Sequence, residues 1–178
     1  MDVRFVPLEL SRIDQLRIEA VFLPFFDDER PLRGAAGLLD WRLCGALSAL
    51  LLGGRVTGAR GELTMLLGKG RLPFEKVILV GEGPGEAFDA AVAAGVTARV
   101  LDAARGLRLK SFACALPGRS RATVRASDAT RWFLDAAADA AVDEVVVLDE
   151  PEAQRAMLPI IEAERRRARA VREREGTD

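Results

Sequence analysis

Histidine, tyrosine and asparagine are all absent from these 178 residues, and cysteine occurs only twice. Without histidine the chain cannot form a Ser-His-Asp or Cys-His catalytic site, and two cysteines cannot build a Cys/His zinc cage. Asparagine amides and tyrosine phenols are likewise excluded as catalytic or orienting groups. We therefore predict no catalytic residue, no metal ligand and no cofactor.

The cysteines and the apolar runs indicate a cytoplasmic protein. Cys44 and Cys114 lie in apolar stretches, where free cysteine behaves as a small hydrophobic residue, and two cysteines do not make a disulfide framework. Charged residues within the first nine positions interrupt the apolar core that a signal peptide needs. The longest apolar run, residues 38–52, contains two charged side chains and is too short to span a bilayer. We expect a soluble chain without membrane contact.

Charge is nearly balanced, with 26 basic residues, 27 acidic ones and a net charge of −1. That balance argues against the strong positive field of a dedicated nucleic-acid-binding protein. Residues 162–175 concentrate six arginines and four glutamates. Attractive and repulsive i,i+4 pairs are mixed there, which is typical of a solvated terminal helix, with a helix that docks on a partner protein as the alternative. No aromatic residue is present in that stretch to stack on a base, so nucleic acid is an unlikely partner.

Hydrophobic patterning predicts alternating strands and helices. The expected strands are residues 3–8, 16–23, 62–67, 76–80, 110–116 and 143–148. The expected helices are residues 35–52, 86–104, 128–141 (capped by Ser127) and about 151–175. The alternation from residue 74 onward implies one α/β domain, residues 1–178, with a mixed, mostly parallel central sheet and helices on both faces.

A glycine-rich turn follows the predicted strand 76–80, in the setting where free backbone N–H groups often bind phosphate. Its spacing, G-x-G-x-G, is neither the P-loop nor the dinucleotide fingerprint. Pro84 lacks a donor N–H, and Glu82 and Glu86 would repel an anion. A tight strand-to-helix turn is the simpler interpretation, and any nucleotide is expected to bind weakly there. The possible ligand or partner loop consists of Gly81, Glu82, Gly83 and Gly85.

Basic and aromatic residues elsewhere have structural interpretations. Arg119, Arg121 and Arg125 alternate with small residues after the predicted strand 110–116, as an anion-binding edge would, but a charged solvent-facing loop is the simpler assignment. The aromatic side chains on apolar helix faces are expected to pack in the core or in an interface, and they are Trp41, Trp132 and Phe133.

Several stretches, taken in order, carry a family resemblance. They are Ala20-Val21-Phe22-Leu23 with the acidic turn after it, the helix 37–47, residues 53–62, and the strand and glycine turn 76–83. In order and spacing they resemble the N-terminal domain of the M17 leucyl (cytosol) aminopeptidases, over about residues 3–150. The resemblance implies a three-layer, macro-like α/β fold.

The same resemblance bears on function. In that family the two-metal catalytic site belongs to a separate C-terminal domain with a signature resembling N-T-D-A-E-G-R-L, and nothing similar occurs in these residues. No catalytic or metal-binding residue can therefore be transferred to a position here. The N-terminal domain is implied to assist oligomer assembly and substrate access. We expect a non-catalytic protein-interaction or assembly domain, with a protein partner or self-association.

Two alternatives remain open. Macro-like folds often bind ADP-ribose or related nucleotides, so a nucleotide-binding module is the main alternative. An enzyme acting on such a nucleotide is the third. Macro-domain hydrolases commonly rely on asparagine, which is absent here, although acidic residues could orient a water molecule instead.

Overall fold

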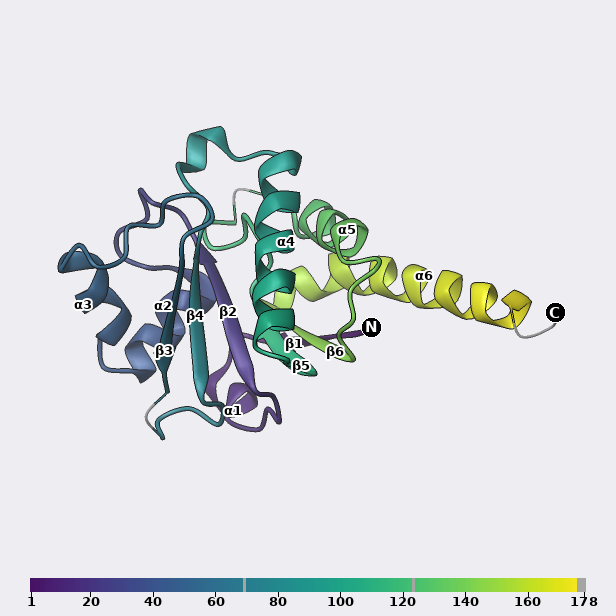
Figure 1. The fold of residues 1–178 in the computed structure, drawn as a ribbon, viewed down its shortest axis with the longest axis horizontal. Helices are drawn as coiled ribbons and strands as arrows, with labels where there is room; N and C mark the ends of the chain where they lie inside the picture. The colour runs from purple at the N-terminus through teal and green to yellow at the C-terminus, as the bar shows by residue number, and fades with distance from the viewer. Residues whose placement is uncertain (69, 123, 176–178) are drawn as a thin grey trace.

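The structure is a computed structural model that describes residues 1–68, 70–122 and 124–175 (Figure 1). Its strands are β1 (Asp2–Pro7), β2 (Ala20–Phe25), β3 (Leu63–Leu67), β4 (Lys76–Gly81), β5 (Ser111–Cys114) and β6 (Glu144–Asp149). Its helices are α1 (Leu10–Ile13), α2 (Gly34–Arg42), α3 (Ala46–Leu52), the 3₁₀ turn η1 (Gly85–Ala87), α4 (Ala90–Gly106), α5 (Ala126–Ala136) and α6 (Pro151–Glu175).

All six strands form one sheet in the order β1-β6-β5-β2-β4-β3. Every neighbouring pair is parallel except β3 and β4, which are antiparallel. The predicted α/β class with a mixed, mostly parallel sheet is confirmed. Because β2, β4, β5 and β6 run in the same direction, their carboxyl ends meet at one edge of the sheet.

Side chains from each central strand supply the cores on both faces of the sheet. Successive strand residues point to opposite faces, so Val145 and Val147 pack with α4, α5 and α6, whereas Val146 and Leu148 pack with α1, α2 and α3. Both sets are almost fully buried. The continuous apolar run of β6 follows from this arrangement, since a parallel strand covered on both faces has no solvent-facing side.

The single helix predicted over residues 35–52 is wrong, because the structure has two helices, α2 and α3, bent by 109°. Cys44 (φ 56°) and Gly45 (φ 79°) adopt the left-handed conformation between them, which no α-helix accommodates. The buried carboxylate of Asp40 accepts hydrogen bonds from the N–H groups of Leu47 (2.8 Å) and Ser48 (3.1 Å) and so caps the start of α3. Cys44 lies at this corner and is exposed.

Several other predicted boundaries differ from those in the structure. The strand expected at 16–23 lies at Ala20–Phe25, after a turn that follows α1. Helix α4 starts at Ala90 instead of residue 86, and Asp89 caps it by accepting the N–H of Val92 at 2.8 Å. Ser127 is not a cap, because α5 already begins at Ala126, and this helix ends at Ala136 instead of residue 141.

Helix α6 begins at Pro151, as predicted, and leads away from the sheet (Figure 1). Its first half packs on the sheet through the buried residues Ala153, Met157 and Ile161. One turn further on, Arg165 donates hydrogen bonds to the carboxylate of Asp2 (2.6 Å) and the C=O of Val3 (2.7 Å). Within the described residues, no single helix is both long and apolar enough to cross a membrane.

Two glycines give a matched test of the packing at the end of β4. A Cβ on Gly81 would lie 2.0 Å from the C=O oxygen of Ala59, whereas a Cβ on Gly95, inside α4, would meet no heavy atom within 4 Å. We predict that Gly81→Ala lowers the free energy of unfolding by more than about 2 kcal/mol, because backbone must move. Gly95→Ala should raise it by up to about 1 kcal/mol, because alanine favours the helix. Urea titration measures both, and equal effects would contradict the close approach at Gly81.

Candidate functional site

Loops from distant parts of the sequence meet at the carboxyl edge of the sheet. They follow β2 (residues 26–33), β4 (82–84) and β5 (115–125), and β6 contributes Asp149. In open α/β sheets this edge is where ligands bind. The geometry therefore makes this edge the first place to look for a site.

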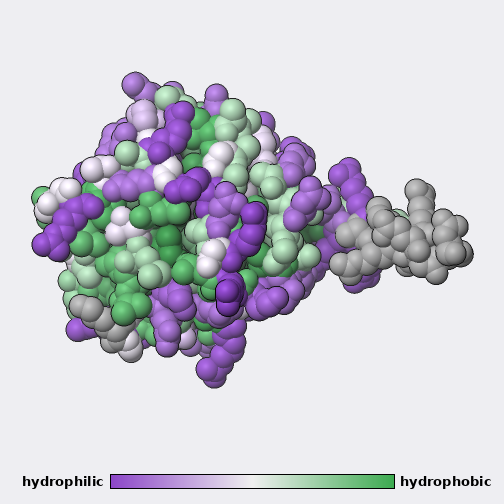
Figure 2. Space-filling view, in the orientation of Figure 1, coloured by the Kyte–Doolittle hydropathy of each residue, from purple (hydrophilic) through white to green (hydrophobic). Residues whose placement is uncertain are grey.

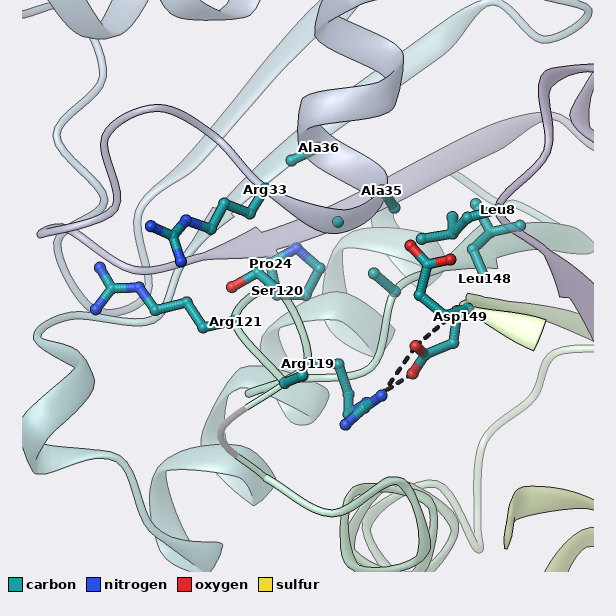
Figure 3. Close-up of a pocket in the computed structure, with 14 residues that line it drawn as sticks. Leu8, Pro24, Arg33, Ala35, Ala36, Arg119, Ser120, Arg121, Leu148 and Asp149 are labelled. Carbon is teal, nitrogen blue, oxygen red and sulfur yellow. Dashed lines mark hydrogen bonds and ion pairs between the residues drawn. The ribbon is translucent and has the colours of Figure 1, made fainter. Parts of the chain in front are cut away.

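A cavity of about 210 Å³ opens at this edge (Figure 3). In Figure 3 the guanidinium groups of Arg33 and Arg121 lie on one side of it, and Leu8, Leu148 and Asp149 lie on the other. Apart from Glu150, which follows Asp149, the side chains that line the rest of the cavity are mostly small or apolar. They come from β2, the start of α2 and the loop after β5, and are Pro24, Gly34, Ala35, Ala36, Ala115, Ser120 and Ala122.

The first turn of α2 presents unused donors to this cavity. The N–H groups of Gly34, Ala35 and Ala36 precede the intrahelical ladder, and no hydrogen bond between described residues uses them. Arg33 is the N-cap residue, but its side chain does not cap the helix. Free N–H groups at the positive end of a helix favour an anion, so this wall suits a phosphate or carboxylate group.

A nearly buried ion pair closes another wall. Arg119 binds the Asp149 carboxylate through two hydrogen bonds of 2.6 and 3.0 Å, and it also donates to the C=O of Val124 at 2.6 Å. Their side chains are only 11% and 4% exposed. The pair joins the loop after β5 to the end of β6, and the Arg119 charge is already matched by a carboxylate.

Arg121 is held at the mouth of the cavity. It donates hydrogen bonds of 3.0 and 2.7 Å to the carboxylate of Asp28 and lies over the Phe26 ring, 5.1 Å from its centroid. The hydrogen bonds from Arg121 lower the pKa of the Asp28 carboxyl group below its usual value.

The buried carboxylate of Glu29 accepts the Ser120 hydroxyl at 2.5 Å and the N–H of Arg33 at 2.8 Å. Arg33 itself has no carboxylate within ion-pair distance among the described residues.

The glycine loop singled out from the sequence lies beside this cavity and does not line it. Two of its backbone N–H groups are already used in hydrogen bonds within the protein. The N–H of Gly81 donates to the C=O of Glu62, and the N–H of Gly83 donates to the C=O of Gly58, each at 2.9 Å. The N–H of Gly85 approaches the Asp28 carboxylate at 3.4 Å. The loop thus shapes the edge of the sheet, while its exposed residue Pro84 faces solvent.

Glu82 differs from its expected role as an anion-repelling surface charge. Its side chain is 0% exposed, one carboxyl oxygen accepts the N–H of Gly118 at 2.8 Å, and the other has no partner among the described residues. Burial raises the pKa of Glu82 to about 8. Near neutral pH the group is therefore mostly uncharged, and it contributes little repulsion.

Sequence patterns found only part of this site. The alternation of Arg119 and Arg121 with small residues pointed to the correct loop. Arg33 and Asp149 were missed, although one signal was available for Arg33: it directly precedes the small residues Gly34 and Ala35 at a helix start. Asp149 ends a buried strand, and nothing local predicts that Arg119 pairs with it.

Comparison with known proteins places this fold. A family model described as the N-terminal domain of the cytosol aminopeptidase family matches residues 21–149. A protein named probable cytosol aminopeptidase from Synechocystis is 31% identical over 101 residues, which is 57% of this chain and 20% of that protein. The alignments with curated relatives span only about a fifth of those relatives' length.

Two solved structures show the same fold. A tomato leucine aminopeptidase mutant superposes with a TM-score of 0.61 at 15% identity, covering 88% of this chain and 34% of that one. A Trypanosoma brucei macrodomain solved in complex with ADP gives 0.64 at 17% identity, covering 87% and 66%. The strand order and these superpositions therefore define a macro-like α/β fold. Within that class, the chain belongs to the cytosol aminopeptidase family through the N-terminal domain of that family.

The raised pKa of Glu82 predicts a pH-dependent stability. Because the folded protein holds this proton up to about pH 8 and an unfolded glutamate releases it near pH 4.5, unfolding becomes easier as the pH rises between those values. Glu82→Gln keeps the shape and removes the titration. We expect the difference in melting temperature between Glu82→Gln and the natural sequence to grow in favour of the variant from pH 5 to pH 8. If the difference in melting temperature between the two proteins stays constant from pH 5 to pH 8, the raised pKa of Glu82 is contradicted.

Proposed function

We propose that these residues form a non-catalytic, cytoplasmic domain that binds another protein chain. Two observations support the proposal. The family match is to the N-terminal domain of the aminopeptidases and covers residues 21–149, and among the described residues the carboxyl-edge site holds arginines and buried carboxylates but no cluster of metal ligands.

Exposed apolar side chains carry the proposal. Four of the large ones lie within residues 41–67, where Trp41 is 70% exposed, Leu52 85%, Met65 52% and Leu67 61%. Trp41 and Leu52 belong to α2 and α3, which pack on one face of the sheet, whereas Met65 and Leu67 lie on β3 and project, like Leu63, from the other face. Large exposed apolar side chains mark protein contact surfaces, here one on α2 and α3 and one on β3. Trp41, expected in a core or an interface, is thus available for an interface.

A capture experiment tests this proposal. The tagged chain, expressed in its own host, should retain a partner that mass spectrometry identifies, and titration calorimetry with that purified partner should confirm direct binding. The double variant Trp41→Ser/Leu52→Ser should weaken binding at least about tenfold, because buried aromatic side chains dominate interface energies.

The matched control is Leu107→Ser, which removes an exposed leucine at the end of α4. It should leave the affinity unchanged. If no partner binds directly, or if both variants bind as well as the natural sequence, the interaction proposal fails. Metal-dependent cleavage of a leucyl amide by the purified chain would contradict its non-catalytic part.

A second candidate function is binding of ADP-ribose or a related nucleotide in the edge cavity. The observation that favours it is the wall of free N–H groups at Gly34–Ala36 next to Arg33 and Arg121. The T. brucei macrodomain of the same fold was solved with ADP. Against tight binding, the cavity of about 210 Å³ is smaller than the roughly 300–1,000 Å³ typical of such ligand sites, and Asp28 offsets the charge of Arg121.

Calorimetric titration with ADP-ribose distinguishes the two functions. We expect a dissociation constant weaker than about 100 μM, because the cavity holds only part of such a ligand. Arg33→Ala should weaken any measurable binding further, whereas Arg55→Ala, which removes an exposed arginine outside the cavity lining, should not. A dissociation constant below about 10 μM that depends on Arg33 would favour the nucleotide-binding function.

A further inference from the structure

Strand β3 is the last strand on its side of the sheet, and among the described residues it pairs only with β4. At the two ends of this antiparallel pair, the N–H of Gly81 donates to the C=O of Glu62 and the N–H of Gly68 donates to the C=O of Glu75. Hydrogen-bonded residues alternate along such a pair, so Thr64 and Leu66 face β4. The N–H and C=O groups of residues 63, 65 and 67 therefore point away from the sheet.

Within Leu63–Leu67 this edge lacks the features that usually prevent strands from pairing, although a bulge lies just before it, where Gly61 and Glu62 both bond to Gly81. Edge strands are commonly protected by charged side chains, proline or a bulge. The five residues of β3, Leu-Thr-Met-Leu-Leu, contain no charge and no proline, and their register with β4 is regular. Met65 and Leu67 project from one face of the strand and are largely exposed. Figure 2 shows hydrophobic surface over this part of the molecule.

The surroundings of β3 favour a single strand as the occupant. Leu47 and Leu51 of α3 belong to the same apolar cluster as the half-buried Leu66 of β3. In Figure 1, α3 extends past β3, away from the centre of the sheet. A second folded copy approaching β3 edge to edge would meet α3, whereas one extended segment fits alongside the strand with one face toward α3.

We propose that β3 accepts an extended segment of a partner protein as a seventh strand of the sheet. Main-chain hydrogen bonds to residues 63, 65 and 67 hold the segment, and its alternate side chains lie beside Met65 and Leu67. The chemistry of the edge specifies that segment: an uncharged centre, with apolar side chains at alternating positions. This proposal rests on the proposed interaction function and names the part of the surface that the partner contacts.

A peptide copy of residues 61–68, Gly-Glu-Leu-Thr-Met-Leu-Leu-Gly, provides the probe. Laid antiparallel with its methionine opposite Met65, it places a donor or acceptor opposite every outward group of β3. Fluorescence anisotropy with the labelled peptide and the intact chain should give saturable binding with a dissociation constant below about 200 μM. The same peptide N-methylated at methionine keeps the side chain and loses one N–H, and it should bind at least about tenfold more weakly.

Protein variants locate the binding. Met65→Pro removes an outward N–H that β4 does not use, so the domain should stay folded while the affinity falls at least about tenfold. Met65→Lys, which keeps the N–H and adds a charge to the edge, should also weaken binding and serves if the proline variant unfolds. Leu107→Lys is the control at a distant exposed leucine and should bind like the natural sequence.

Three results would overturn the proposal. The first is that the peptide shows no saturable binding, and the second is that the N-methylated peptide binds as well as the unmodified one. The third is that light scattering shows the chain to self-associate and that Met65→Lys abolishes this self-association, because the occupant of the β3 edge would then be a second copy. If the peptide fails while Trp41→Ser/Leu52→Ser still releases a captured partner, the interaction function stands and only the role of β3 falls.

Discussion

The carboxyl ends of β2, β4, β5 and β6 share one edge of the sheet, so the loops that follow them must satisfy one another's polar groups there. Arg119 reaches Asp149, Arg121 reaches Asp28, and Glu82 accepts an N–H from the loop after β5. Each contact joins segments at least 30 residues apart in sequence. The contacts of Arg119 and Arg121 help to shape the cavity, because its lining comes from several segments that are far apart in sequence.

Those contacts also determine how much charge the cavity can offer a ligand. Arg119 and Arg121 are both engaged by carboxylates, which leaves Arg33 and the first turn of α2 as the unengaged positive groups among the described lining residues. A ligand that needs both arginines would have to compete with Asp28 and Asp149. The ion pairs therefore stabilise this edge of the sheet, and the same ion pairs limit its affinity for anions.

The sequence predicted the features of the fold that depend on local patterning. The apolar runs of β4 and β6 marked buried parallel strands, and the order of elements indicated the α/β class. The macro-like fold came from the resemblance of several stretches to the aminopeptidase N-terminal domain. The break between α2 and α3 was not predictable in the same way, because it depends on Asp40 capping a helix that starts six residues later. The leucine-rich run of residues 38–52 therefore predicts one helix, because the sequence does not show the hydrogen bond between Asp40 and Leu47.

The site was harder to predict than the fold for a related reason. Glu82, flanked by glycines, has the sequence appearance of an exposed turn residue, yet its burial depends on the loop of Gly118, 36 residues away. Arg119 could be recognised as basic, but its partner Asp149 could not. Ionisable residues follow no periodic rule, since their environments are set by tertiary contacts.

Helix α6 has a consequence for how this domain can be connected to anything else. Its 25 residues correspond to roughly 37 Å of helix, and its first half is fastened to the sheet while its far end lies well away from it (Figure 1). A group joined to that far end would lie at a distance from the edge cavity and on the opposite side of the domain from β3 (Figure 1). A fluorophore or an affinity tag attached there would report on the tumbling of the domain without obstructing either surface.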